Sequence, residues 1–134
     1  MGFALSVTVH LGFDQTVAAL REALAAQGFG ILTEVDLSGT LKTKLDVDVP
    51  RQLLLGACRP AFAYRALQVE DRVGLLLPCS LTVRAGGDGA DGPTLVDAVD
   101  PDTLVQLTGN PALSDVAAEV RSGLRAALDA VATR

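Results

Sequence analysis

The C-terminal segment of the chain carries a long apolar stripe at helical spacing. Its members recur every three or four residues, which places them on one face of a helix that begins near Asn110 or Ser114. The stripe consists of Val116, Val120, Leu124, Leu128 and Val131. A helix with so long an apolar face must cover another layer of structure, so we expect it to lie across one face of a β-sheet.

Short segments in which apolar and polar residues alternate supply the strands of that sheet. We expect strands at residues 4–11, 30–37, 51–57, 73–77, 79–84 and 94–99, with a bend at Pro78. Asp14 can cap a helix that ends at Gly28, and Pro60 suits the first position of a helix that continues to Gln68. Shorter helices are expected at residues 38–45 and after Asp100.

This order of elements predicts an α+β fold. Two long helices and about five or six strands, the later ones joined by short loops, favour an antiparallel sheet with helices packed on one side. The 134 residues suit a single domain that spans residues 1–134. Hydrophobic residues make up 49% of the chain and aromatic residues only 4%, so the core must consist mainly of aliphatic side chains.

Charge and composition argue against several classes of function. The net charge is -5, no basic run occurs and Trp is absent, so we expect neither nucleic-acid nor membrane binding. Neither a signal peptide nor an apolar stretch of membrane-spanning length is recognisable, which predicts a cytoplasmic protein with reduced thiols. His10 is the only histidine, so it and the two cysteines are too few for the four ligands of a structural zinc site, and we expect no metal site. We expect no cofactor either.

Cys58 and Cys79 are the one concentrated chemical feature. Cys58 precedes Arg59 and Pro60 at the expected start of a helix, where the helix dipole can activate a thiol or hold an anion. Cys79 follows Pro78 at a bend that can face a pocket, with Ser80 beside it. The alternative is that both are inert, buried thiols. If the two met, they would close a loop suited to a reversible disulfide, but the spacing does not decide whether they meet.

A glycine-rich motif and a pair of lysines each have a functional and a plainer interpretation. Residues 87–92 match G-x-G-x-x-G, but Pro93 and a strand follow where a dinucleotide site needs a helix, so we interpret them as a hairpin loop. Lys42 and Lys44 are the only lysines. Lys44 can either point at a pocket or form part of the solvated surface.

Six ordered sequence blocks resemble the DUF302 family, a family of small proteins of unknown function. They are residues 27–36, 40–45, 55–60, 63–67, 74–80 and 97–101, and the resemblance extends from about Val7 to the C-terminal helix. The family typically has asparagine after each cysteine, where this chain has Arg59 and Ser80. The resemblance implies a compact fold similar to the TATA-binding-protein class without its DNA-binding role, frequent homodimers, and no known activity.

Three hypotheses about function remain. The first is a small-ligand-binding or thiol-dependent module with a pocket around Cys58 and Cys79, in which Lys44 and Ser80 contribute and Arg59 pairs with an anionic ligand. The second is a structural or interaction homodimer without catalysis. The third is a small-molecule enzyme that uses carboxylates such as Glu34, Asp36 or Asp100. The sequence leaves open whether the protein is an enzyme.

Overall fold

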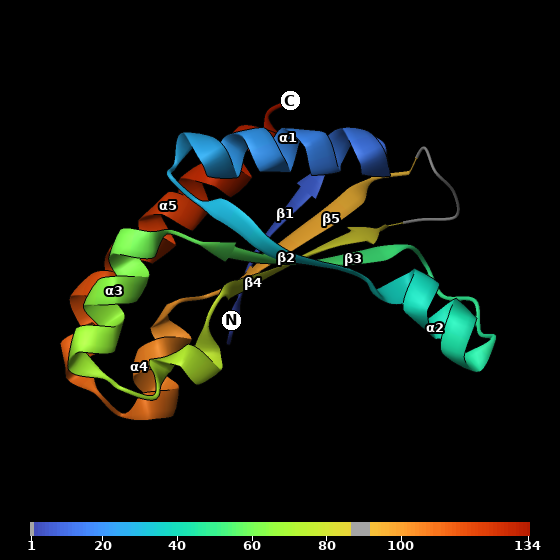
Figure 1. Ribbon diagram of the computed structural model, residues 1–134. Coiled ribbons are helices and arrows are strands. Elements are labelled where there is room, and N and C mark those ends of the chain that lie inside the picture. Colours follow the sequence, from blue (N-terminus) through green and yellow to red (C-terminus); the bar gives the residue numbers. More distant parts are fainter. Residues whose placement is uncertain (1, 87–91) are drawn as a thin grey trace.

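The computed structural model describes residues 2–86 and 92–134, and its centre is a five-stranded sheet (Figure 1). The strands are β1 (Ala4–Val9), β2 (Gly30–Asp36), β3 (Gln52–Cys58), β4 (Cys79–Ala85) and β5 (Thr94–Val99). Their order in the sheet is β1-β5-β4-β3-β2, and every neighbouring pair is antiparallel. The prediction of an α+β fold with an antiparallel sheet is confirmed.

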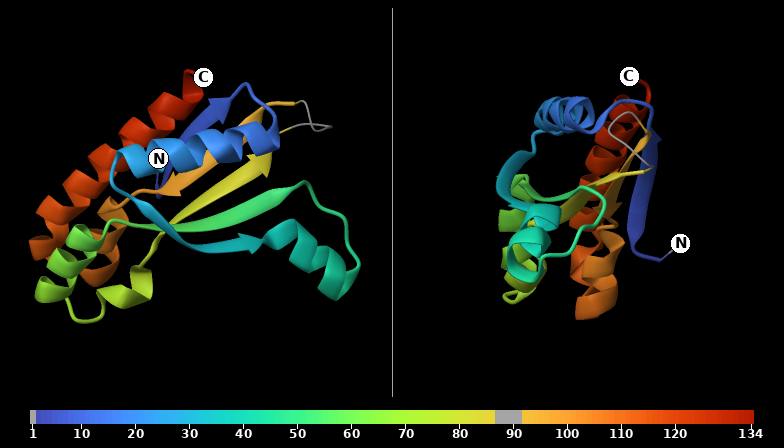
Figure 2. Two further views of the ribbon diagram at one scale, coloured as in Figure 1. Left: turned by 45° about the horizontal axis from the view of Figure 1, so that its top comes forward. Right: turned by 90° about the vertical axis from the view of Figure 1, so that its right-hand side faces the viewer.

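Two long helices cover one face of this sheet (Figure 2). The helices are α1 (Phe13–Ala26), α2 (Leu37–Leu45), α3 (Pro60–Val69), α4 (Asp102–Thr108) and α5 (Ser114–Ala132), and two short 3-10 helices are η1 (Val73–Leu76) and η2 (Pro111–Leu113). The long ones are α1 and α5, and every member of the predicted C-terminal stripe is buried. None of the helices in the described ranges has both the length and the apolar character of a membrane span.

The core lies between the sheet and these two helices. Leu81 and Val83 of β4 and Val96 of β5 point to the helix side, where at most 1% of each residue is exposed. Leu124 and Leu128 of α5 are fully buried against them. Burial of each such side chain stabilises the fold by about 1.5–3 kcal/mol, so this single layer supplies the main driving force for folding.

No long helix of the described residues covers the opposite face of the sheet. Ser80 and Thr82 of β4 and Leu54 of β3 point to this uncovered face, as expected from alternation along the strands. Helices η1 and α4 flank it at one end, and α2 projects beyond the sheet at the other end (Figure 1). The uncovered face is therefore the floor of a concave surface.

Two local predictions were wrong. Residues 73–77 do not form a strand, because η1 occupies residues Val73–Leu76 and Leu75 is 85% exposed. A short apolar run has no periodicity that separates a strand from a helical turn. Asp14 does not cap α1 either. The N-cap is Gly12, whose N–H donates to the side chain of Gln15 at 3.4 Å, and Asp14 lies in the first turn.

Candidate functional site

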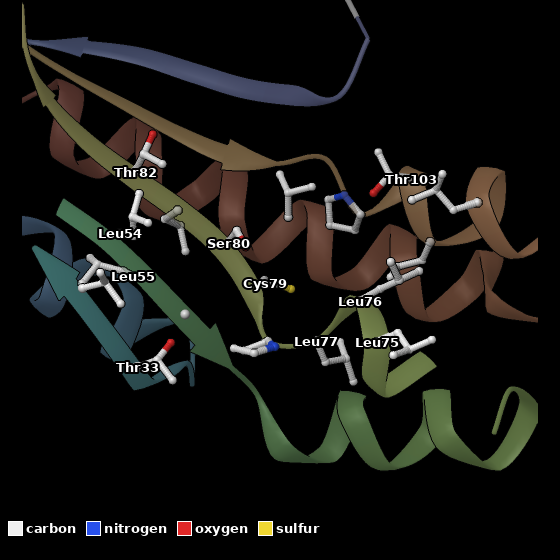
Figure 3. A pocket seen from close by; sticks show the side chains of 18 residues that line it. Thr33, Leu54, Leu55, Leu75, Leu76, Leu77, Cys79, Ser80, Thr82 and Thr103 are labelled. Atoms are coloured by element: carbon white, nitrogen blue, oxygen red, sulfur yellow. The ribbon is translucent and has the colours of Figure 1, made fainter. Parts of the chain in front are cut away.

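A groove on the uncovered face, with a volume of about 480 Å³, lies at the predicted site residues Cys79 and Ser80 (Figure 3). Its floor is formed by β2, β3 and β4, and its walls by η1 and α4. The floor residues include Thr33, Leu54, Gly56, Ser80 and Thr82. The groove exists because three strands from distant parts of the sequence lie side by side in the sheet.

The groove is uncharged and mostly apolar. None of the 18 described residues that line it is acidic, basic or histidine. The hydroxyl groups of Thr33, Ser80 and Thr82 are the polar groups of its floor (Figure 3). Thr103 adds a hydroxyl from α4, and its Oγ1 donates to the carbonyl oxygen of Asp100 at 2.8 Å. The described lining residues can therefore form hydrogen bonds with a bound molecule, but they cannot neutralise a charge on it.

The space that both cysteines line is much smaller than the groove. It measures about 20 Å³ and lies between the end of β3, α3 and α5. Cys58, Arg59 and Cys79 line it together with the rings of Phe29 and Phe62. This volume holds about one water molecule. Cys58, Arg59 and Cys79 therefore line one space, a point that the sequence left open, and this space is too small for a ligand larger than a water molecule.

The two thiols are neighbours across the β3–β4 pair, and both are free. Cys79 lies opposite Ala57, which precedes Cys58 in β3. Burial, followed by the charge of a Cys58 thiolate, raises the pKa of the Cys79 thiol to about 11. Cys79 is therefore protonated at neutral pH, where a nucleophilic or redox role needs the thiolate.

The structure places the five candidate residues in three different settings. Cys79 and Ser80 line the groove, and Cys79 also lines the small cavity with Cys58 and Arg59. Arg59 is the N-cap residue of α3, as predicted, and its guanidinium lies 4.3 Å from the ring centroid of Phe62. Lys44 is exposed on α2 and lines none of these spaces.

The carboxylates of the enzyme hypothesis occupy two separate places. Glu34 and Asp36 line a hollow of about 290 Å³ beside α1, where Glu34 pairs with Arg21. Asp36 accepts hydrogen bonds from Gly39 N at 3.0 Å and from the Ser38 hydroxyl at 2.9 Å. The backbone hydrogen bond, followed by that from Ser38, lowers the Asp36 pKa, the opposite of what a general acid requires. Asp100 lies elsewhere and pairs with Arg121.

Metal binding finds no support in the arrangement of side chains. Across residues 2–86 and 92–134, no three side chains of His, Cys, Asp or Glu gather closely enough to hold an ion. The glycine-rich motif at residues 87–92 lies almost entirely outside the described residues.

Sequence reasoning missed most residues of the groove. Leu75 and Leu76 were assigned to a strand. Thr103 and Leu107 lie in a helix that was expected, but neither residue was predicted to belong to a site. One signal was available, since Ser80 and Thr82 alternate with Cys79, Leu81 and Val83 and mark the polar side of β4. The strand order that adds Thr33 to the same surface is not readable from one segment.

Comparison with known proteins identifies the family. The model of the family described as "Domain of unknown function DUF302" matches residues 5–131. The chain belongs to the DUF302 family. A DUF302 crystal structure, that of an uncharacterized conserved protein from Bacillus stearothermophilus, superposes with a TM-score of 0.88 at 32% sequence identity. The match covers 98% of this chain and 99% of that one. No curated protein matches the chain.

Arg59 and Ser80, the residues that follow the two cysteines, have different surroundings in this structure. Ser80 lines the groove, whereas Arg59 lies against Phe62 and the backbone of Gly28. A Cβ atom added at Gly28 would lie 3.1 Å from Arg59 Nε. Of these two residues, only Ser80 contributes a polar side chain to the groove.

Proposed function

We propose that this DUF302 protein binds a small, neutral and largely apolar molecule in the groove of the uncovered face. The observation that carries the proposal is the lining, which combines a volume of about 480 Å³ with 18 uncharged residues. Small-molecule sites have volumes of about 300–1,000 Å³, and apolar side chains with a few oriented polar groups line them. The hydroxyls of Thr33, Ser80 and Thr82 serve as those polar groups.

The electrostatics favour a neutral ligand over the anionic ligand expected from Arg59. A charged group that enters the groove loses its hydration and meets no opposite charge there, which makes its binding unfavourable. Arg59 does not line the groove. The raised pKa of Cys79 also favours simple binding over thiol chemistry, because the thiol that lines the groove is protonated at neutral pH.

A matched pair of fluorescent probes tests this proposal. N-phenyl-1-naphthylamine is neutral, and 8-anilino-1-naphthalenesulfonate is the same ring system with an added sulfonate. We expect saturable binding of the neutral probe and at least about tenfold weaker binding of the sulfonate.

Two variants locate the bound probe. Ser80→Phe fills the groove and should abolish binding of the neutral probe, whereas Thr8→Phe, on an exposed position of β1 outside the groove, should leave binding unchanged. Thermal unfolding of both variants checks that they fold. Equal binding of the two probes, or unchanged binding to folded Ser80→Phe, would refute the proposal.

A further inference from the structure

Two apolar surfaces on the concave side of the molecule have no partner within the described chain. The first is the rim of the groove, where Leu75 of η1 is 85% exposed and Leu107 of α4 is 70% exposed. These two leucines lie on η1 and α4, which form the walls of the groove on either side of its opening to solvent. Exposed leucines grouped around a concave site are typical of a surface that contacts something else.

The second surface is an arm formed by residues 37–51, which comprise α2 and the segment that returns to β3. No residue of the arm is buried. Leu45 is 65% exposed, and Val47 and Val49 are 41% and 42% exposed. A helix as short as α2 is only marginally stable in water without packing. It is held by the Asp36 cap and by a hydrogen bond from Gln52 N to the Ser38 hydroxyl at 3.1 Å, both at its first turn. Its last turn is held by ion pairs of Lys42 with Asp46 and Asp48, which contribute little when exposed.

The arm and the rim of one chain cannot reach each other. β3 begins at Gln52 beside the arm and ends at Cys58, which lines the small cavity together with Leu104 of α4, so a strand of about 23 Å separates the arm from the end of the sheet where the rim lies. Both surfaces nevertheless lie on the concave side, at opposite ends of the same sheet (Figure 1). In a dimer with a two-fold axis, the uncovered faces of the two copies can face each other with their strands running in opposite directions. The arm of each copy then lies at the groove of the other copy.

We propose that the arm of a second copy docks across the mouth of the groove, so that the ligand site is closed only in a reciprocal homodimer. The proposal rests on the ligand-binding function proposed above for the groove. Leu45 and Val47 of one copy pack on Leu75 and Leu107 of the other, and the same contact repeats through the symmetry axis. Each contact removes exposed apolar surface from water on both partners, which is the main driving force for association.

The charges near the two surfaces are complementary. Lys42 has its partners within the arm, but Lys44 forms no ion pair among the described residues. Asp102 lies in the first turn of α4, next to the groove residue Thr103, and has no ion pair in the same part of the chain. In the reciprocal dimer, Lys44 of each arm lies toward Asp102 of the other copy, which favours the opposed orientation.

A complementation experiment tests arm-to-groove docking directly. Leu45→Lys alters the arm and Leu107→Lys alters the rim, and each change damages both contacts of its own homodimer. In a mixture of the two variants, the mixed dimer combines one contact that carries both changes with one contact that is entirely unaltered. We expect size-exclusion chromatography with light scattering to show a wild-type dimer, at least about tenfold weaker dimers of each variant, and recovery of dimers in the mixture.

Matched controls carry the same charge on the same helices. Thr43→Lys lies on α2 and Gln106→Lys on α4, both at exposed positions, and both should dimerise like the wild type. A wild-type chain that stays monomeric up to millimolar concentration would overturn the proposal. So would a mixture without recovery, or controls that weaken the dimer as much as the test variants do.

Binding of N-phenyl-1-naphthylamine separates this proposal from the one on which it rests. If the neutral probe binds the wild type and Leu45→Lys equally, the groove binds ligands without the arm and docking at its mouth is refuted. If dimers and complementation are observed but the probe does not bind, docking stands and ligand binding fails. We expect weaker probe binding to Leu45→Lys and restored binding in the mixture of variants.

Discussion

Pro78 packs directly against the backbone of Gly56 on the floor of the groove. A Cβ atom built on Gly56 would lie 2.6 Å from Cγ of Pro78 and would also collide with the hydroxyl of Thr33. Gly56 sits in β3 opposite Ser80, so the absence of its side chain lets the segment before β4 close onto β3. The contact lies in the lining of the groove, one residue before β4 begins at Cys79.

Replacement of Gly56 by alanine should therefore destabilise the protein. The added methyl group overpacks the floor, and we expect a loss of about 1–3 kcal/mol in the free energy of unfolding, measured by urea denaturation. Gly74→Ala is the matched control, because no atom of residues 2–86 and 92–134 lies within 4 Å of a Cβ at that position. A Gly56→Ala variant as stable as Gly74→Ala would contradict the close contact between Pro78 and β3.

The two cysteines should differ in reactivity towards iodoacetamide. Cys79 is buried and its pKa is raised to about 11, so a Cys58→Ser variant should be labelled very slowly at neutral pH and faster as the pH approaches that value. Cys58 is half-buried, and a Cys79→Ser variant should be labelled faster at neutral pH. Mass spectrometry of the native variants measures both rates, and rapid labelling of Cys79 at neutral pH would show that its site is open.

The same raised pKa predicts how Cys79 affects stability at alkaline pH. A thiol whose pKa is higher in the folded than in the unfolded protein stabilises the fold fully below its unfolded pKa. That contribution is lost as the pH rises to about 11. The wild type should therefore lose stability relative to Cys79→Ala over this alkaline range, and parallel stability curves of the two proteins would be inconsistent with the shift.

The arm helix should depend on its Asp36 cap. The carboxylate accepts the Gly39 N–H, and this bond is the main cause of the lowered Asp36 pKa. Asp36→Ala should increase hydrogen exchange of the α2 amides at neutral pH, whereas Asp48→Ala, in the return segment, should change exchange much less. Because the pKa of Asp36 is lowered in the folded protein, the carboxylate stabilises the fold at pH values above the ordinary pKa of an aspartate. This stabilisation is lost as the pH falls through the folded value.

The sequence predicted those elements that have a long apolar repeat or a residue typical of a helix end. The stripe from Val116 to Val131 defined α5, and Pro60 defined the start of α3 with Arg59 at its cap. The short run at residues 73–77 was assigned to a strand, because five apolar or small residues without periodicity fit a strand and a 3-10 turn equally.

The site could be predicted only in part, because strand order creates it. Cys79 and Ser80 were chosen from their place after Pro78, and both line the groove. Thr33, Thr82 and Leu107 come from three separate elements, and nothing within any one element indicates that they face the same space. Cys58 does not line the groove but a separate cavity of about 20 Å³, whose lining includes Phe29 and Phe62, and its place there depends on packing that one strand does not reveal.

Leucine-methyl NMR of the wild-type protein, titrated with N-phenyl-1-naphthylamine, is the most direct test of the neutral-ligand groove. The account predicts saturable shifts of the methyl groups of Leu54, Leu76 and Leu107, which line the groove, while those of Leu20, Leu124 and Leu128 in the core stay unchanged. Shifts confined to the core leucines, or no shifts up to the solubility limit of the probe, would contradict it.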